Sequence, residues 1–158
     1  VAIKNNIVDV LGSDHAPHLK VNKDKEYPDT PSGMPGVQTI FPVMLDHVNN
    51  VSPTFVERLK KCDEFDIVGN TRGIGLIGAM EFVSEKNTNK GFDKKGVAGK
   101  IFADHAKDNG LIVRAIGDVI AFCPPLIIKD SQINDMFDIV EHSLKKTMDD
   151  LTAQGLLK

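Results

Sequence analysis

The stretch that decides the fold is LIVRAIGDVIAFCPPL, residues 111–126. Two β-prone runs flank Gly117 and Asp118, and a glycine at the first central position of a two-residue loop is typical of a type II′ hairpin turn. Such a turn fixes the register of both strands. It predicts the cross-strand pairs Ile116 with Val119, Ala115 with Ile120, Arg114 with Ala121, Val113 with Phe122, and Ile112 with Cys123.

Arg114 is the one charged side chain on the strands of this hairpin. Side chains alternate between the two faces of a strand. One face is therefore expected to carry Val113, Ala115, Ile120 and Phe122, and the other Ile112, Ile116, Val119, Ala121 and Cys123 around Arg114. Two interpretations of Arg114 stay open. Its guanidinium is placed to bind a planar anion such as a carboxylate in a bidentate manner, or its stem lies on the sheet with the charged head in water.

The composition limits the classes of protein to which the chain can belong. Its 158 residues suffice for one domain with a hydrophobic core, and a formal net charge of -3 leaves no polybasic surface for nucleic acid or membrane. Cys62 and Cys123 stand singly in apolar settings, which predicts buried thiols in a reducing compartment. Because the chain shows no signal-peptide pattern and no apolar run near the roughly 20 residues of a membrane span, we expect a cytoplasmic protein.

Residues 53–158 alternate in a way that predicts an α+β fold. Ser52 and Pro53 form an expected helix start, because a capping hydroxyl followed by proline at the first helical position is favoured. The patterns then predict that helix, strands at residues 67–72 and 75–83, a helix at residues 97–109, the hairpin, and a last helix from Asp130 or Ser131 to Gly155. The expected architecture is a small, mostly antiparallel sheet with helices on one face.

Residues 1–50 contain a strand pattern, a polar loop and a helix pattern, which is too little to form a core alone. The motif GSDHAPH, residues 12–18, follows the strand pattern. It contains three residues able to ligate a metal, which are Asp14, His15 and His18. Consecutive strand residues point to opposite faces, so a metal site here would need distant partners.

GSDHAPH, followed by PSGMPGVQTIFPVML at residues 31–45, resembles the eighth-strand segment of dihydroorotases and related cyclic amidohydrolases. The resemblance implies that residues 1–50 are an incomplete fragment of a TIM-barrel-like protein. It implies that Asp14 is a zinc ligand and the general acid/base, and that His18 contacts the substrate carboxylate. The family's HxH pair, carboxylated lysine and further histidines have no match in the chain. Without them Asp14 cannot generate a metal-bound hydroxide.

ERLKKCDEFDIVGNTRGIGLIGAMEFV, residues 57–83, and GLIVRAIGDVIAFCPPLIIKDSQIND, residues 110–135, are similar to the C-terminal small domain of class III aminotransferases. The resemblance covers residues 51–158 and points to the omega-amino acid and 4-aminobutyrate type, which uses pyridoxal phosphate (PLP). It implies that Arg114 holds the carboxylate of an amino acid or 2-oxo acid. The family's Schiff-base lysine belongs to a large domain that the chain does not match, so no lysine here is assigned to the cofactor.

Three functional interpretations follow from these resemblances. The first is an aminotransferase small domain, inactive alone, whose partner is an amino acid or 2-oxo acid once a large domain is supplied. The second is the tail of a zinc-dependent cyclic amidohydrolase, and the third is a non-catalytic fusion or recombined fragment. The first also predicts an exposed apolar patch around Ile112, Ile116 and Val119, through which a homodimer is expected to form.

Overall fold

The structure, a computed structural model, describes residues 18–26, 28–33 and 37–157. By its internal contacts the chain divides into two units, Val1–Val48 and Asn49–Lys158. The short helix α1 (Lys20–Lys23) belongs to the first unit, and α2 (Val37–Lys61) begins there. The strand predicted near the N-terminus lies outside the described residues. Within the described ranges, no helix has both the length and the apolar character needed to cross a membrane.

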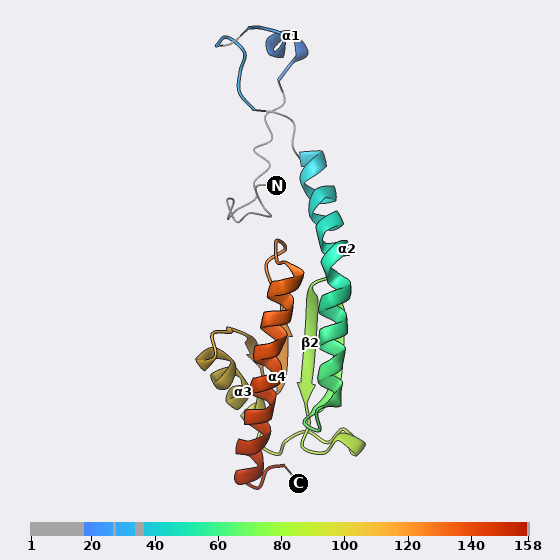
Figure 1. Ribbon diagram of the computed structural model, residues 1–158, viewed down its shortest axis with the longest axis vertical. Coiled ribbons are helices and arrows are strands. Elements are labelled where there is room, and N and C mark those ends of the chain that lie inside the picture. The colour runs from blue at the N-terminus through green and yellow to red at the C-terminus, as the bar shows by residue number, and fades with distance from the viewer. Residues whose placement is uncertain (1–17, 27, 34–36, 158) are drawn as a thin grey trace. The chain divides into compact units, whose positions relative to one another are not determined.

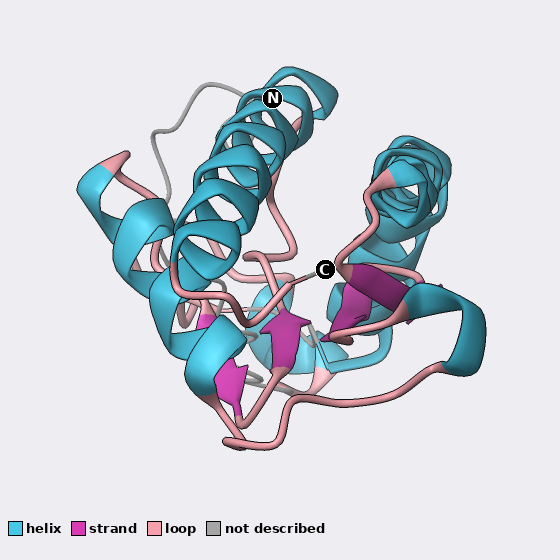
Figure 2. Ribbon diagram, turned by 90° about the horizontal axis from the view of Figure 1, so that it is seen from below, coloured by secondary structure: helices cyan, strands magenta, loops and turns pink. Residues whose placement is uncertain are grey.

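The second unit contains, within the described part of the chain, a four-stranded antiparallel sheet of order β1-β2-β4-β3 (Figures 1 and 2). Its elements are η1 (Cys62–Glu64), β1 (Val68–Ile74), β2 (Ile77–Phe82), η2 (Lys86–Thr88), α3 (Val97–Asp108), β3 (Arg114–Ile116), β4 (Val119–Phe122) and α4 (Asp130–Ala153). The pairing of β2 with β4 joins the β1–β2 and β3–β4 hairpins into one sheet. Helix α3 lies in the chain segment that connects these two hairpins. The α+β class and the antiparallel sheet are confirmed.

The β3–β4 hairpin has the predicted register, with Arg114 opposite Ala121. Gly117 has a φ of 61°, whereas Asp118 does not have a positive φ. This combination fits the predicted type II′ turn, in which only the first central residue takes a positive φ.

The face predicted to carry Ala115, Ile120 and Phe122 forms, since Ala115 lies opposite Ile120, but only its β4 residues are buried. Ile120 and Phe122 are buried, but Ala115 is exposed. The ladder also ends at Arg114, so Val113 does not pair with β4 as expected. The physical reason is that β3 is a short edge strand. A strand at an edge has a neighbour on one side only, which leaves a small side chain such as Ala115 open to solvent.

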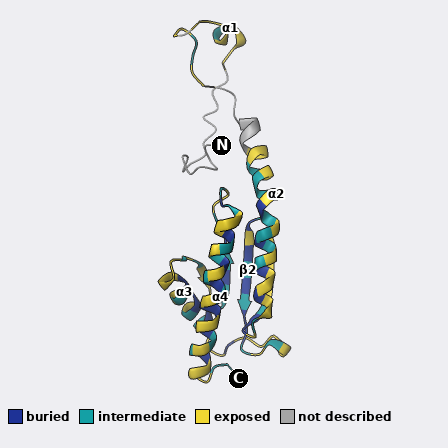
Figure 3. Cartoon of the chain, in the orientation of Figure 1, coloured by how far each residue is buried: buried dark blue, intermediate teal, exposed yellow. Residues whose placement is uncertain are grey.

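Helices α2, α3 and α4 cover one face of the sheet, and aromatic residues form the core between the layers. The ring of Phe102 in α3 lies 5.3 Å from that of Phe82 in β2, measured between centroids. Phe137 in α4 contacts Phe55 in α2 at 5.6 Å and Phe122 in β4 at 5.8 Å. Figure 3 shows the buried residues, in dark blue, gathered where α2, α4 and β2 lie beside one another. The opposite sheet face, called here the outer sheet face, lies outside this core.

The predicted helix start at Ser52 and Pro53 is wrong, because α2 runs without a break through both residues. Proline inside a helix removes one backbone hydrogen bond and crowds the preceding turn, and this cost is what favours a helix start in the sequence. The side chains that face the core from this half of α2 recur every fourth residue and are buried: Val51, Phe55 and Leu59. Their tertiary packing outweighs the local cost of Pro53.

Candidate functional site

Arg114 begins β3 and belongs to the outer sheet face. Its cross-strand partner Ala121 alternates along β4 with the buried residues Ile120 and Phe122. Directly opposed residues share a face, so Arg114 and Ala121 lie on the side of the sheet that the helices do not cover. Arg114 is exposed there.

Arg114 differs from the two other arginines of the chain in its partners. The guanidinium of Arg58 lies 2.6 Å from a carboxylate oxygen of Asp138, and that of Arg72 lies 3.3 Å from a carboxylate oxygen of Glu81. Among the described residues, Arg114 has no carboxylate partner. Because a guanidinium carries five N–H donors and no acceptor, Arg114 is the arginine left to bind an anion from solution.

A pocket of about 530 Å³ lies beside Arg114 and is lined by residues 111–114 and 121–125 together with Ile128 and Met136. Arg114 is the one charged residue among those that line it. Pockets of roughly 300 to 1,000 Å³ with mainly apolar walls and few polar groups are typical of small-molecule sites. The arrangement therefore offers one cation beside an apolar wall. Sequence reasoning found Arg114 but missed Ile128 and Met136, which reach the pocket from a distant part of the chain.

Asp118 fixes the hairpin to the N-terminus of α3. Its Oδ2 accepts a hydrogen bond from the N–H of Gly96 at 2.7 Å, and its Oδ1 accepts from the N–H groups of Ala98 and Gly99 at 3.0 and 3.1 Å. Helix α3 has no side-chain cap of its own. Asp118 thus supplies from another element the acceptor that an N-cap residue usually provides.

Gly99 allows the hairpin turn to approach α3 this closely. A Cβ atom at Gly99 would lie 2.0 Å from the carbonyl oxygen of Gly117. We call this arrangement of Asp118 and Gly117 against residues 96–99 the Asp118 clamp. Because Arg114 lies on the same hairpin, the clamp sets its position relative to the helical layer.

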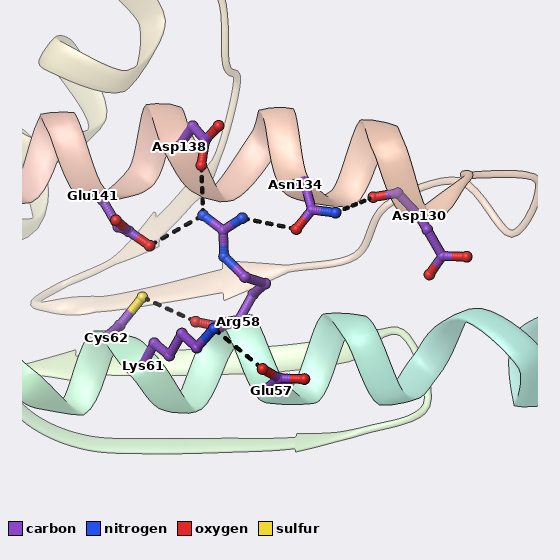
Figure 4. Close-up of polar contacts among 8 residues, drawn as sticks. All are labelled: Glu57, Arg58, Lys61, Cys62, Asp130, Asn134, Asp138 and Glu141. Carbon is purple, nitrogen blue, oxygen red and sulfur yellow. Dashed lines mark hydrogen bonds and ion pairs between the residues drawn. The ribbon is translucent and has the colours of Figure 1, made fainter.

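Arg58 joins α2 to α4 (Figure 4). Its Nη2 donates to the carboxylates of Asp138 and Glu141 at 2.6 and 3.0 Å, and its Nη1 donates to the side-chain oxygen of Asn134 at 2.8 Å. The guanidinium also lies 5.8 Å from the Phe137 ring centroid. Burial lowers the pKa of Arg58, but the hydrogen bonds to the two carboxylates outweigh burial and hold the pKa above its ordinary value. This network is a structural connection between two helices.

Of the two cysteines predicted to be buried, one is buried and the other is exposed. Cys62 is buried, as predicted, but Cys123 is exposed. Burial, and secondarily the nearby carboxylates of Glu141 and Asp63, raise the pKa of the Cys62 thiol to about 12. Cys123 follows the end of β4 at the Arg114 pocket. Its exposure follows from its position beyond the last strand residue, where the helices no longer cover the chain.

The predicted zinc site gains no support. Asp14 and His15 lie outside the described residues. His18 is exposed, and its Nε2 lies 3.0 Å from the carbonyl oxygen of Ser32. Within the described ranges, no three side chains of metal-ligating type are grouped closely enough to hold an ion.

The described lysines do not fit the Schiff-base role that PLP requires. Such a lysine is usually desolvated or lies beside a group that lowers its pKa, whereas no lysine is buried in the described part of the chain. A second pocket of about 540 Å³ includes Lys86 and Lys90. However, the Lys86 ammonium donates to the carbonyl oxygens of Asp63 and Phe65, and Lys90 is exposed. No cofactor lysine is therefore assigned among these residues.

The apolar patch expected on the outer sheet face is present. Ile112 is 87% exposed and Ile116 is 56% exposed, while Val119 is half-buried. Ile74 and Ile77, paired at the end of the β1–β2 hairpin, add two further exposed apolar side chains. Arg114 thus lies on a sheet face of predominantly apolar character.

Comparison with known families places most of the second unit in one family. A profile described as Aminotransferase class-III matches residues 38–144. Gamma aminobutyrate transaminase 1, mitochondrial, of Solanum lycopersicum is 35% identical over 104 residues, which cover 66% of the chain and 20% of that protein. Putrescine–pyruvate aminotransferase of Pseudomonas aeruginosa is 36% identical over 96 residues, covering 61% and 21%. The matched part thus spans about a fifth of the length of these relatives.

Solved structures support the same assignment. The omega-transferase from Vibrio fluvialis JS17 has a TM-score of 0.68 and 34% identity, covering 71% of the chain and 27% of that structure. A PLP-bound aminotransferase mutant from Vibrio fluvialis has a TM-score of 0.66 and 32% identity, covering 70% and 25%. These comparisons support the aminotransferase resemblance and give no support to an amidohydrolase segment or to a fusion of two families. The profile match also begins at residue 38, within the stretch assigned to the amidohydrolase resemblance.

Proposed function

The chain belongs to the class-III aminotransferases, and from this premise we propose that Arg114 binds the carboxylate of an amino acid or 2-oxo acid in PLP-dependent transamination. The observation that carries the proposal is the unpaired guanidinium of Arg114 beside a pocket of about 530 Å³. A carboxylate matches a guanidinium in charge and in planar shape, and it can accept two parallel hydrogen bonds.

The proposed role of this chain is to bind and orient the carboxylate. Class-III aminotransferases use PLP, and one similar solved structure is a PLP-bound mutant. The described lysines do not fit the cofactor, because none of them is buried. We assign the cofactor chemistry to protein that the described residues do not include.

The test is a titration of the ¹⁵N-labelled 158-residue chain with pyruvate and with 4-aminobutanoate, followed by NMR at the arginine Nε–H groups. We expect both carboxylates to shift the Arg114 signal. The signals of Arg58 and Arg72 should stay in place, because those guanidinium groups are already paired. Equal shifts at Arg72 and Arg114 would indicate non-specific attraction and would make the proposal wrong.

Two variants make this test specific. Arg114→Gln should weaken carboxylate binding, measured at backbone amides, by about tenfold or more, because a hydrogen bond to a charged group contributes roughly 1.5–3 kcal/mol. Arg72→Gln is the matched control, since Arg72 lies on the same sheet but outside the pocket. It should leave carboxylate binding unchanged.

The proposal also predicts that the purified chain, mixed with PLP, does not transfer the amino group of an omega-amino acid to pyruvate. The reason is that the described residues offer no buried lysine for the cofactor. The measurement is alanine formation compared with PLP in buffer. Formation well above that background would contradict the division of roles proposed here.

A further inference from the structure

We infer that Asp118 is a positioning residue for Arg114, and that its hold on the start of α3 sets the affinity of Arg114 for a carboxylate. This inference rests on the proposed function, because it takes Arg114 as the group that binds the carboxylate. It adds a residue that does not line the pocket but controls the strength of binding there.

Strand β3 has little support from its own ladder. It consists of three residues at the edge of the sheet, so it pairs with β4 alone. All three residues are exposed. A short strand with a neighbour on one side only can tilt or lift with the loss of few contacts. The position of Arg114, its first residue, therefore depends on what holds the other end of the strand.

Asp118 holds that end, because it joins the hairpin turn to two other elements. Its carbonyl oxygen accepts a hydrogen bond from the N–H of Phe82 in β2 at 2.8 Å. Its carboxylate accepts three hydrogen bonds from the backbone N–H groups at the start of α3. Hydrogen bonds to an ionised group are roughly twice as strong as those between neutral groups. Asp118 is also half-buried, which limits competition from water.

Helix α3 is fixed to the core and gives the turn a firm base. Ala98, Phe102 and Ala106 are buried along one side of the helix. The Phe102 ring packs edge-on against that of Phe82, with 5.3 Å between the centroids. The helix cannot follow a moving turn without opening these contacts. The Asp118 carboxylate thus ties the tip of the hairpin to the core.

The origin of this cap shows that it does more than stabilise α3. A capping residue usually stands at the N-cap position of its own helix. Gly96 occupies that position, where it has a φ of 80° and no side chain. The acceptor comes instead from the hairpin, 22 residues after Gly96 and 19 after Gly99. Its loss would therefore release the hairpin tip as well as the helix end.

Charge and position make opposite predictions for the removal of Asp118. Its carboxylate is negative, so by charge alone its removal would strengthen the attraction between a ligand carboxylate and the same hairpin. If Asp118 acts by position, its removal weakens binding, because only molecules with the hairpin in place bind well. The direction of the change therefore identifies the role.

The experiment is the NMR titration of the 158-residue chain with pyruvate, read at the Arg114 Nε–H group. We expect Asp118→Ala to lower the affinity about fivefold, which corresponds to a hairpin in place in about a fifth of the molecules. Asp118→Asn removes the same charge but keeps the side-chain shape and one acceptor oxygen. It should lower the affinity only about twofold, and it provides the test if Asp118→Ala fails to fold.

Arg58→Lys is the matched control for a loss of stability. The side-chain hydrogen bonds of Arg58 end on α4 and not on the hairpin. Urea denaturation of each variant gives its free energy of unfolding. We expect Arg58→Lys to be less stable than the wild type and to bind pyruvate with unchanged affinity. A merely structural role for Asp118 would instead make affinity follow stability in all the variants.

The outcomes separate this inference from the proposed function. Unchanged or tighter pyruvate binding in both Asp118 variants would overturn the inference and leave the proposed function standing. Losses of affinity that follow stability alone, with Arg58→Lys as weak as Asp118→Ala, would do the same. A wild-type chain whose Arg114 signal does not shift with pyruvate would overturn the proposed function, and the inference with it.

Discussion

Gly99 is a position in α3 that cannot accept even one added carbon without moving backbone, because its missing Cβ would meet the carbonyl oxygen of Gly117 at 2.0 Å. We expect Gly99→Ala to lower the free energy of unfolding by about 3 kcal/mol, the upper end of the cost of overpacking. Urea denaturation measures the change. Gly91→Ala is the matched control, since a Cβ there meets nothing within 4 Å. Similar stability of the two variants would contradict the close approach.

Cys62 makes the stability of the fold depend on pH in the alkaline range. Burial raises the pKa of its thiol from 9.0 to about 12, so above pH 9 the unfolded chain loses a proton that the folded chain keeps. The folded state is then increasingly disfavoured as pH rises from 9 to 12. Urea titrations across this range should show a fall in stability that Cys62→Ala lacks.

The reaction of the thiols with Ellman's reagent gives an independent check on the same residue. At pH 8 we expect Cys123, which is exposed, to react and Cys62, which is buried, to stay unmodified until the chain unfolds. In a Cys123→Ser variant the folded chain should therefore give no rapid reaction. Rapid modification of Cys62 in that variant would contradict its burial.

The connection between α2 and α4 depends on the shape of the Arg58 side chain as well as on its charge. Arg58→Lys keeps a cation but cannot reach Asn134, Asp138 and Glu141 at once. We expect this substitution to lower the free energy of unfolding by about 1–2 kcal/mol. Thermal or urea denaturation measures the loss.

The matched control for Arg58 lies one turn along the same helix. Lys61 pairs with Glu57 at 3.1 Å, but both side chains are more than half exposed. Such a surface pair contributes little, so Lys61→Met should change stability by less than about 0.5 kcal/mol. Equal losses from the Arg58 and Lys61 variants would show that the network adds nothing beyond a surface ion pair.

Sequence patterns predict those elements of this fold whose structure depends on residues close together in the chain. The β3–β4 hairpin follows from Gly117 and Asp118 alone, because turn chemistry and register are local properties. The continuity of α2 through Pro53 could not be predicted in this way. It depends on Phe55 and Leu59 packing against the sheet and α4, and those contacts are set by tertiary structure.

Local sequence patterns likewise predict only part of the candidate site. Arg114 stands out in the sequence as a cation in an apolar hairpin, and the family resemblance gives it a role. Met136 lines the Arg114 pocket, and Asp118 accepts hydrogen bonds from backbone N–H groups at the start of α3. Both contacts join residues that are far apart in the chain. One signal was available for the latter, since the segment GVAG at residues 96–99 begins a helix without any capping side chain of its own. Such a helix start calls for an acceptor from elsewhere.

At the scale of the whole molecule, the outer sheet face is the feature that most affects behaviour in solution. It presents the exposed side chains of Ile74, Ile77, Ile112 and Ile116 on one side of a single sheet. Contiguous apolar surface of this kind favours association. We therefore propose that two copies of the chain associate through this face.

Sedimentation equilibrium of the purified chain tests this association. We expect a dimer population that rises with protein concentration up to about 100 µM, within the roughly 1 µM to 1 mM range of weak association, and Ile116→Lys should shift the population toward monomer. Leu126→Lys is the control, because Leu126 is half exposed but lies outside the strands. A wild-type chain that stays monomeric at this concentration would make the proposal wrong.

The Asp118 clamp affects how fast three backbone amides exchange their hydrogens with water. Backbone amides in the first turn of a helix usually lack partners within the helix and exchange their hydrogens with water readily. Here the amides of Gly96, Ala98 and Gly99 are held by Asp118, so each exchanges only in moments when the turn has lifted from α3. Because Arg114 lies on that hairpin, the exchange of these three amides reports the fraction of time in which the hairpin keeps the position on which the proposed carboxylate binding depends.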